Sequence, residues 1–158
     1  MGGRGLKLEK ATLKDAPQIH KLINSYTGNG FLLPRSLMEI YESIRDFFVI
    51  RDGERIVGTA ALKIVWEDLA EIRSVLVLEE YKGKGWGRAL IRACVEEAKS
   101  LGVKKVFVLT NSPGYFSRLG FRLVDKRELP HKVWSDCLKC PKFPDCDEVA
   151  MLVDLSDT

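Results

Sequence analysis

The sequence lacks any long hydrophobic run and any strong excess of one charge. Its apolar stretches, such as residues 75–78, are far shorter than the roughly 20 residues that a membrane-spanning helix needs. The net charge is only +3 over 158 residues, and both signs are interspersed. A general nucleic-acid-binding surface is therefore not indicated. We expect neither a membrane nor a nucleic acid as a partner, whereas an anionic small molecule would suit the modest basic excess.

The chain also lacks a signal peptide, repeats and low-complexity tracts. Residues 2–5 lead directly into an alternating segment without the apolar core of a secretory signal, so we expect a cytoplasmic protein. Its four cysteines would then be reduced thiols or metal ligands rather than a disulfide framework. An apolar content of 46% supports one core in a chain of this length. We predict a single domain over residues 1–158.

Hydrophobic periodicity and turn residues predict alternating strands and helices. The expected strands cover residues 6–11, 46–51, 55–65, 70–78, 106–109, 121–124 and, as an edge strand, 149–155. The expected helices begin after Thr12, near Leu37, near Gly87 and after Ser112. The middle of the chain reads as antiparallel sheet. Residues 106–109 are apolar on both faces, which is typical of a central strand reached through a strand–helix–strand crossover.

The most informative segment is a glycine loop, residues 82–88 (Lys-Gly-Lys-Gly-Trp-Gly-Arg), between an apolar strand and an amphipathic helix. Glycines let the backbone approach an anion closely, and a helix N-terminus adds free N–H groups and a favourable dipole. The spacing excludes a dinucleotide-binding G-x-G-x-x-G and a P-loop with its Lys-Ser or Lys-Thr pair. The loop predicts a pyrophosphate site, and a flexible surface turn is the alternative.

Two motifs carry a resemblance to a known family. Residues 82–87 match the signature Gln or Arg, two residues, Gly, one residue, Gly or Ala, except that Lys82 replaces the Gln or Arg. Residues 115–121 match an aromatic pair followed by a basic residue and Leu-Gly-Phe. The chain resembles the GCN5-related N-acetyltransferases (GNAT) from Leu6 to about Val124. That resemblance implies acetyl-CoA as co-substrate and an α/β (α+β) fold: a mixed sheet of six to seven strands, splayed between the fourth and fifth, with about four helices.

The resemblance also implies three groups of cofactor contacts. Backbone groups before the loop would bind the pantetheine arm, at Val75, Leu76 and Val77. Backbone N–H groups of the loop would hold the pyrophosphate, at Lys82, Gly83, Lys84, Gly85, Trp86, Gly87 and Arg88. The residues near the thioester would be Asn111 and either Tyr115 or Phe116.

Acetyl transfer to an amine needs a group that takes the amine proton and an acid for the leaving thiolate. Glu71 is the candidate base, because its position resembles that of the catalytic glutamate in protein-acetylating members; a solvated glutamate at a strand start is the alternative. The usual acid is a tyrosine at the second position of the aromatic pair, where this chain has Phe116. Adjacent helical residues point about 100° apart, so two roles stay open for Tyr115. It is either the acid or a packing residue, and in the second case solvent would protonate the thiolate.

The acceptor is suggested by residues 32–36 and the tail 129–148, which resemble stand-alone amino-acid N-acetyltransferases classed with N-acetylglutamate synthase. The implied reaction is direct transfer, in a ternary complex, to the α-amine of glutamate, the opening step of arginine biosynthesis. Two carboxylates call for cations, and the candidates are Arg35, Arg73 and Lys132. Arg73 shares a strand face with Glu71. Solvated surface charge is the alternative for all three, and for Arg35 and Lys132 it is the favoured interpretation. A homodimer is a further expectation.

The cysteines of the tail are candidate metal ligands. Cys137, Cys140 and Cys146 could bind zinc with His131, but a redox-sensitive disulfide and free thiols are alternatives, and zinc is not expected. Cys94 reads as a core residue. Three other functions also stay open: acetylation of another small amine or of a protein, non-catalytic sensing of acyl-CoA, and zinc-dependent nucleic-acid binding.

Overall fold

The computed structural model describes residues 5–26, 35–129 and 148–155. The chain divides into two compact units. The first unit is Met1–Lys63 with Ile72–Glu97, and the second is Ile64–Glu71 with Ala98–Thr158. The single domain over residues 1–158 stays a prediction, and each unit is described by itself.

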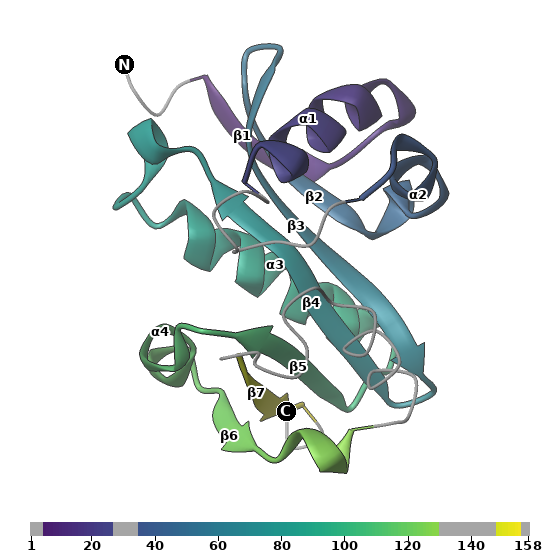
Figure 1. Ribbon diagram of the computed structural model, residues 1–158, viewed down its shortest axis with the longest axis vertical. Coiled ribbons are helices and arrows are strands. Elements are labelled where there is room, and N and C mark those ends of the chain that lie inside the picture. Colours follow the sequence, from purple (N-terminus) through teal and green to yellow (C-terminus); the bar gives the residue numbers. More distant parts are fainter. Residues whose placement is uncertain (1–4, 27–34, 130–147, 156–158) are drawn as a thin grey trace. The chain divides into compact units, whose positions relative to one another are not determined.

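The described residues form seven strands and four α-helices, in the order expected from the sequence (Figure 1). The strands are β1 (Leu6–Lys10), β2 (Phe47–Asp52), β3 (Arg55–Trp66), β4 (Leu69–Val77), β5 (Lys105–Thr110), β6 (Arg122–Val124) and β7 (Val149–Asp154). The helices are α1 (Ala16–Tyr26), α2 (Leu37–Glu42), α3 (Trp86–Ser100) and α4 (Pro113–Arg118). The described residues also include short 3-10 turns at Leu13–Asp15, Ile44–Asp46, Glu79–Tyr81 and Lys126–Glu128.

The strands form one mixed sheet in the order β1-β2-β3-β4-β5-β7-β6, which confirms the predicted fold. β1 pairs with β2 and β2 with β3 in antiparallel fashion, and Gly53, with φ of 61°, makes the predicted turn between β2 and β3. β4 and β5 pair in parallel through the α3 crossover. Their register runs only from Leu69–Lys105 to Glu71–Phe107, although β4 continues to Val77 and β5 to Thr110.

The prediction of an edge strand at residues 149–155 is wrong. β7 lies between β5 and β6, so that Leu152 faces Phe107 on one side and Arg122 on the other. The reason is visible in the residues, because Ala150, Met151 and Leu152 are consecutive and all buried, as a strand covered on both faces requires. The edge position belongs to β6, where Leu123 is exposed.

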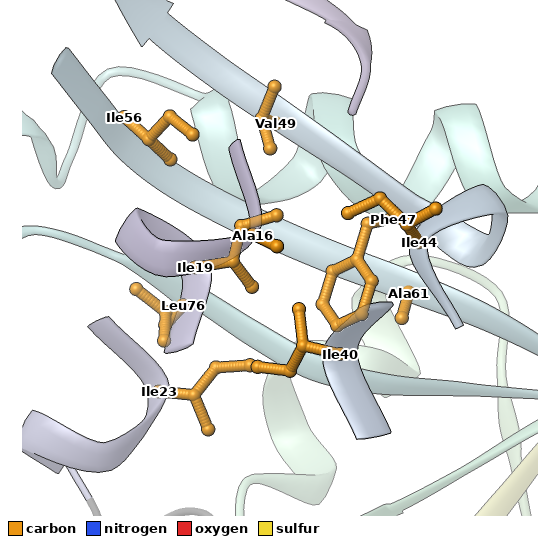
Figure 2. Close-up of a cluster of buried hydrophobic side chains, with 10 residues drawn as sticks. All are labelled: Ala16, Ile19, Ile23, Ile40, Ile44, Phe47, Val49, Ile56, Ala61 and Leu76. Atoms are coloured by element: carbon orange, nitrogen blue, oxygen red, sulfur yellow. The ribbon is translucent and has the colours of Figure 1, made fainter. Parts of the chain in front are cut away.

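The core of the first unit packs α1 and α2 against one face of β2, β3 and β4, as Figure 2 shows. Ile19 and Ile23 are four residues apart and therefore lie on the same side of α1, toward the sheet. Each fully buried isoleucine contributes about 1.5–3 kcal/mol relative to exposure. The cluster consists of Ala16, Ile19, Ile23, Ile40, Ile44, Phe47, Val49, Ile56, Ala61 and Leu76.

The opposite face of the same strands is covered by α3. Phe47 points to α1 and α2, so the next residue, Phe48, points the other way. The Nζ of Lys10 lies 4.5 Å from the centre of the Phe48 ring and 3.0 Å from a carboxylate oxygen of Glu97 on α3. Cys94 of α3 is fully buried, which confirms its predicted place in the core, and this burial raises the pKa of its thiol to about 12.

The second unit has its own core. Leu69, Phe107, Leu129, Ala150 and Leu152 pack together between the start of β4 and the strands β5 and β7. Within the described residues, no helix combines the length and the apolar composition that crossing a bilayer requires.

Candidate functional site

The glycine loop adopts a conformation that requires glycine at two positions. Gly83 and Gly85 have φ of 79° and 89°, a region in which side chains with a Cβ are strained. An added Cβ would meet nothing within 4 Å at either position. Backbone conformation, rather than lack of space, therefore explains these glycines.

The loop ends in the N-terminus of the long helix α3. The first intrahelical bond joins the Ala89 N–H to the Gly85 carbonyl at 3.0 Å. The N–H groups of Trp86, Gly87 and Arg88 precede that bond and have no carbonyl within the helix to donate to. They provide donors and a positive dipole end for an anion.

The cations of the loop are at the surface. Lys82, Lys84 and Arg88 are exposed, and the Nζ of Lys82 lies 3.4 Å from a carboxylate oxygen of Glu79. Both partners of that ion pair are at least half exposed, so the pair is weak and Lys82 can exchange it for a phosphate oxygen.

A strained residue that the sequence did not reveal lies immediately before the predicted pantetheine segment. Ser74 in the middle of β4 has φ of 56° and is buried. The Thr59 hydroxyl donates a 2.8 Å hydrogen bond to the Ser74 carbonyl, and a Cβ added at Gly58 would lie 3.3 Å from the Leu76 carbonyl. Such a break in β4 redirects the backbone at Val75 and the two residues that follow.

Replacing Gly85 by alanine tests the loop against a matched control. Gly102, just after α3, has φ of 85° and equally open surroundings. Both alanine variants should lose about 1–2 kcal/mol of unfolding free energy because both place a Cβ in the left-handed region. Only Gly85→Ala should weaken CoA affinity, by about tenfold or more, as measured by titration calorimetry. Equal CoA affinity in the two variants would contradict the loop assignment.

Glu71, the candidate base, is buried in β4, with only 7% of its surface exposed. The alternative of a solvated glutamate is therefore wrong. Within the sheet it is opposite Phe107, in the last pair of the β4–β5 register. Its burial fits a proton acceptor in a site with little water.

The aromatic pair has one inward and one outward member. Phe116 is buried and makes edge-to-face contacts with Tyr115 and Phe121, each with ring centroids 5.4 Å apart. Tyr115 is 36% exposed. Asn111 is also exposed, where β5 gives way to α4. Packing thus accounts for Phe116, and Tyr115 is the member that a ligand could reach.

Arg35 has its backbone held by an asparagine of α1. The side-chain amide of Asn24 accepts a 3.1 Å hydrogen bond from the Arg35 N–H and donates a 2.9 Å bond to the Arg35 carbonyl. The next residue, Ser36, forms a capping box with Glu39 at the start of α2. No local sequence pattern predicts the Asn24 contact, because 11 residues separate the partners.

The charges of two predicted substrate cations act on one carboxylate in the first unit. The pKa of Glu39 is lowered, chiefly by the hydrogen bond from the Ser36 N–H and further by the charges of Arg35 and Arg73. The pKa of nearby Asp46 is raised by burial, although Lys10, Lys63 and Arg73 oppose that shift. Arg35 and Arg73 thus both contribute positive charge around the start of α2.

The predicted site residues are divided between the two units. The first unit contains the glycine loop, residues 75–77, Arg35 and Arg73. The second contains Glu71, Asn111, Tyr115 and Phe116. Lys132 and the candidate zinc ligands His131, Cys137, Cys140 and Cys146 lie outside the described residues. Among the residues that are described, no group of three or more acidic, histidine or cysteine side chains could hold a metal ion.

Comparisons with known proteins agree with the fold. The model of the acetyltransferase (GNAT) family matches residues 16–121. An uncharacterised N-acetyltransferase of Chlorobaculum tepidum is 42% identical over 145 residues, which cover 92% of this chain and 94% of that protein. The amino-acid acetyltransferase of Mycobacterium tuberculosis is 32% identical over 132 residues, which cover 82% of this chain and 75% of that protein. N-acetylglutamate synthase from Neisseria gonorrhoeae, solved with coenzyme A and N-acetyl-glutamate, superimposes with a TM-score of 0.85 at 26% identity, covering 95% of this chain but 35% of that one.

Proposed function

Because this chain belongs to the acetyltransferase (GNAT) family and is an acetyl-CoA-dependent amino-acid N-acetyltransferase, we propose that its acceptor is glutamate. The observation that carries this choice is that the charges of Arg35 and Arg73 both act on the Glu39 carboxylate. Two guanidinium groups that act on one anion would suit a substrate carboxylate, and Arg binds carboxylates through paired hydrogen bonds. The names of the relatives support the same substrate class.

The proposed reaction is direct transfer in a ternary complex. The α-amine nitrogen attacks the thioester carbonyl carbon, its proton passes to Glu71, and the carbon–sulfur bond breaks. The thiolate then takes a proton from Tyr115 or from water. The N–H groups of the glycine loop fix the pyrophosphate during these steps, so that the reacting atoms are held in place without further ordering.

Glutamate as the acceptor would imply a metabolic role. Acetylation of the glutamate α-amine opens arginine biosynthesis, and we propose that role in the cytoplasm. A homodimer stays a prediction.

An acceptor panel tests the proposal. Acetyl-CoA-dependent thiol release should give the highest kcat/KM with glutamate among glutamate, glutamine, aspartate, lysine and a peptide with a free N-terminus. A higher kcat/KM with glutamine would leave the amino-acid assignment standing and remove the need for a second carboxylate site. Turnover with the peptide but with none of the amino acids would contradict the proposal and indicate protein acetylation.

Arg73→Gln should raise KM for glutamate about 10- to 100-fold, because the variant loses a charge-assisted hydrogen bond to a carboxylate, a contribution of about 1.5–3 kcal/mol. KM for acetyl-CoA should change little. Arg122→Gln is the matched control, since Arg122 of β6 forms an exposed ion pair with Asp154 of β7. An unchanged KM for glutamate in Arg73→Gln would contradict the assigned carboxylate site.

A further inference from the structure

We propose that Tyr81 is a positioning residue for the cofactor: its hydrogen bond to Asp52 fixes the start of the glycine loop against the β2–β3 turn. The inference rests on the proposed role of the loop as the pyrophosphate site. All residues involved belong to the first unit.

The need for such a contact follows from the loop itself. At Gly83 and Gly85 nothing lies within 4 Å of the position that a Cβ would occupy, so side-chain packing does not hold the loop there. Its course is determined by its two ends. One end is the N-terminus of α3, and the other is the 3-10 turn Glu79–Tyr81.

That turn is built from short-range backbone bonds. The Tyr81 N–H donates to the Leu78 carbonyl at 2.9 Å, and the Lys82 N–H donates to the Glu79 carbonyl at 3.2 Å. Upstream, the Leu78 N–H donates to the Val57 carbonyl of β3 at 2.8 Å. These bonds define the turn, but after Leu78 they do not connect it to the sheet.

The side chain of Tyr81 supplies that connection. Its hydroxyl donates a hydrogen bond to Oδ2 of Asp52, and hydrogen bonds to an ionised acceptor are stronger than those between neutral groups. Asp52 is well fixed, because it pairs with Leu6 of β1 and with Arg55 of β3 at the corner of the sheet. The bond also raises the pKa of Tyr81, so the hydroxyl stays protonated and able to donate at neutral pH.

A neighbouring ion pair joins the same two segments but is weaker. Arg55 and Glu80 are 3.5 Å apart, and their side chains are 57% and 62% exposed. An exposed pair of this kind contributes little, because water and salt screen it. Tyr81 and Asp52 therefore provide the specific connection, and Arg55 and Glu80 provide a control.

CoA binding by titration calorimetry tests the inference. Tyr81→Phe should weaken CoA affinity about three- to tenfold, the range expected for one lost hydrogen bond. At saturating acetyl-CoA, kcat should stay within about twofold, and KM for the acceptor should not change. Asp52→Ala should match Tyr81→Phe, and the double variant should be no worse than either. Asp52→Asn keeps an acceptor oxygen and should restore most of the affinity.

Several results would overturn the inference. Wild-type CoA affinity in Tyr81→Phe, or a lower melting temperature with no change in CoA affinity, would leave Tyr81 with a structural role at most. An equal loss in Glu80→Gln would assign the effect to surface charge instead. If wild-type protein itself does not bind CoA, the proposed function fails along with the inference, whereas tight wild-type binding with unaffected variants removes only the role of Tyr81.

Discussion

Glu71→Gln is expected to lower kcat by about 10²- to 10³-fold, the usual contribution of a positioned general base. The amide is nearly the same size as the carboxylate, so it fits the buried position in β4 but cannot take the amine proton. KM for acetyl-CoA should change much less than kcat, because the loop that holds the pyrophosphate is untouched. Steady-state thiol release with varied acetyl-CoA and glutamate separates the two parameters.

The matched control is Glu67→Gln. Glu67 is exposed between β3 and β4, in the same unit as Glu71. This variant should keep wild-type kcat and wild-type melting temperature. A Glu71→Gln enzyme that is folded and within threefold of wild-type kcat would show that another group or a water chain takes the proton.

Asp15→Asn is expected to lower the free energy of unfolding by about 2–3 kcal/mol, somewhat below the 3–5 kcal/mol typical of breaking a fully buried ion pair. Asp15 is 2% exposed and accepts two hydrogen bonds from the Arg51 guanidinium, at 2.9 and 2.8 Å. It also accepts a 2.8 Å bond from the Thr12 N–H. Arg51 keeps its contact with Glu9 in the variant, which limits the loss. Denaturant unfolding at neutral pH measures the effect.

The same pair predicts a pH dependence of stability. The Arg51 hydrogen bonds hold the pKa of Asp15 below its usual value of 3.8. A carboxyl with a lowered pKa in the folded state stabilises the protein above its unfolded pKa, and that contribution disappears as the pH falls through the folded pKa. Wild-type protein should therefore lose more stability than Asp15→Asn when the pH falls below about 4. Asp125→Asn, which removes an exposed partner of Arg127, should leave neutral-pH stability almost unchanged. Equal effects of the two substitutions would contradict the structural role of Asp15.

Local patterns in the sequence were sufficient for the elements and for the loop. The Asp52-Gly53 turn, the periodicity of α3 and the glycines at 83 and 85 all reflect interactions between near neighbours, and the structure has them as expected. The family resemblance then implied a mixed sheet of six to seven strands with about four helices, and the structure has seven strands and four α-helices in the described residues. The place of β7 between β5 and β6 was not predicted, because it depends on pairing with strands elsewhere in the chain, which leaves no local pattern in the sequence.

The contacts that the sequence did not reveal join residues far apart in the chain. Tyr81 and Asp52 are separated by 29 residues, and Thr59 and Ser74 by 15. The positive φ of Ser74 had no signal either, since serine rarely adopts it and only the surrounding sheet enforces it. The burial of Glu71 depends on the pairing of β4 with β5, which a charged residue at a strand start does not predict by itself.

The central claim is acetyl transfer from acetyl-CoA to the α-amine of glutamate, and one competition experiment tests it most directly. Purified protein would be incubated with ¹³C-acetyl-CoA and an equimolar mixture of the natural amino acids, and the labelled products would be identified by mass spectrometry. We predict N-acetylglutamate as the dominant labelled product, formed about 10²- to 10³-fold more slowly by Glu71→Gln. A labelled product formed mainly from another amino acid, or no labelled amino acid from protein that binds CoA, would contradict the claim.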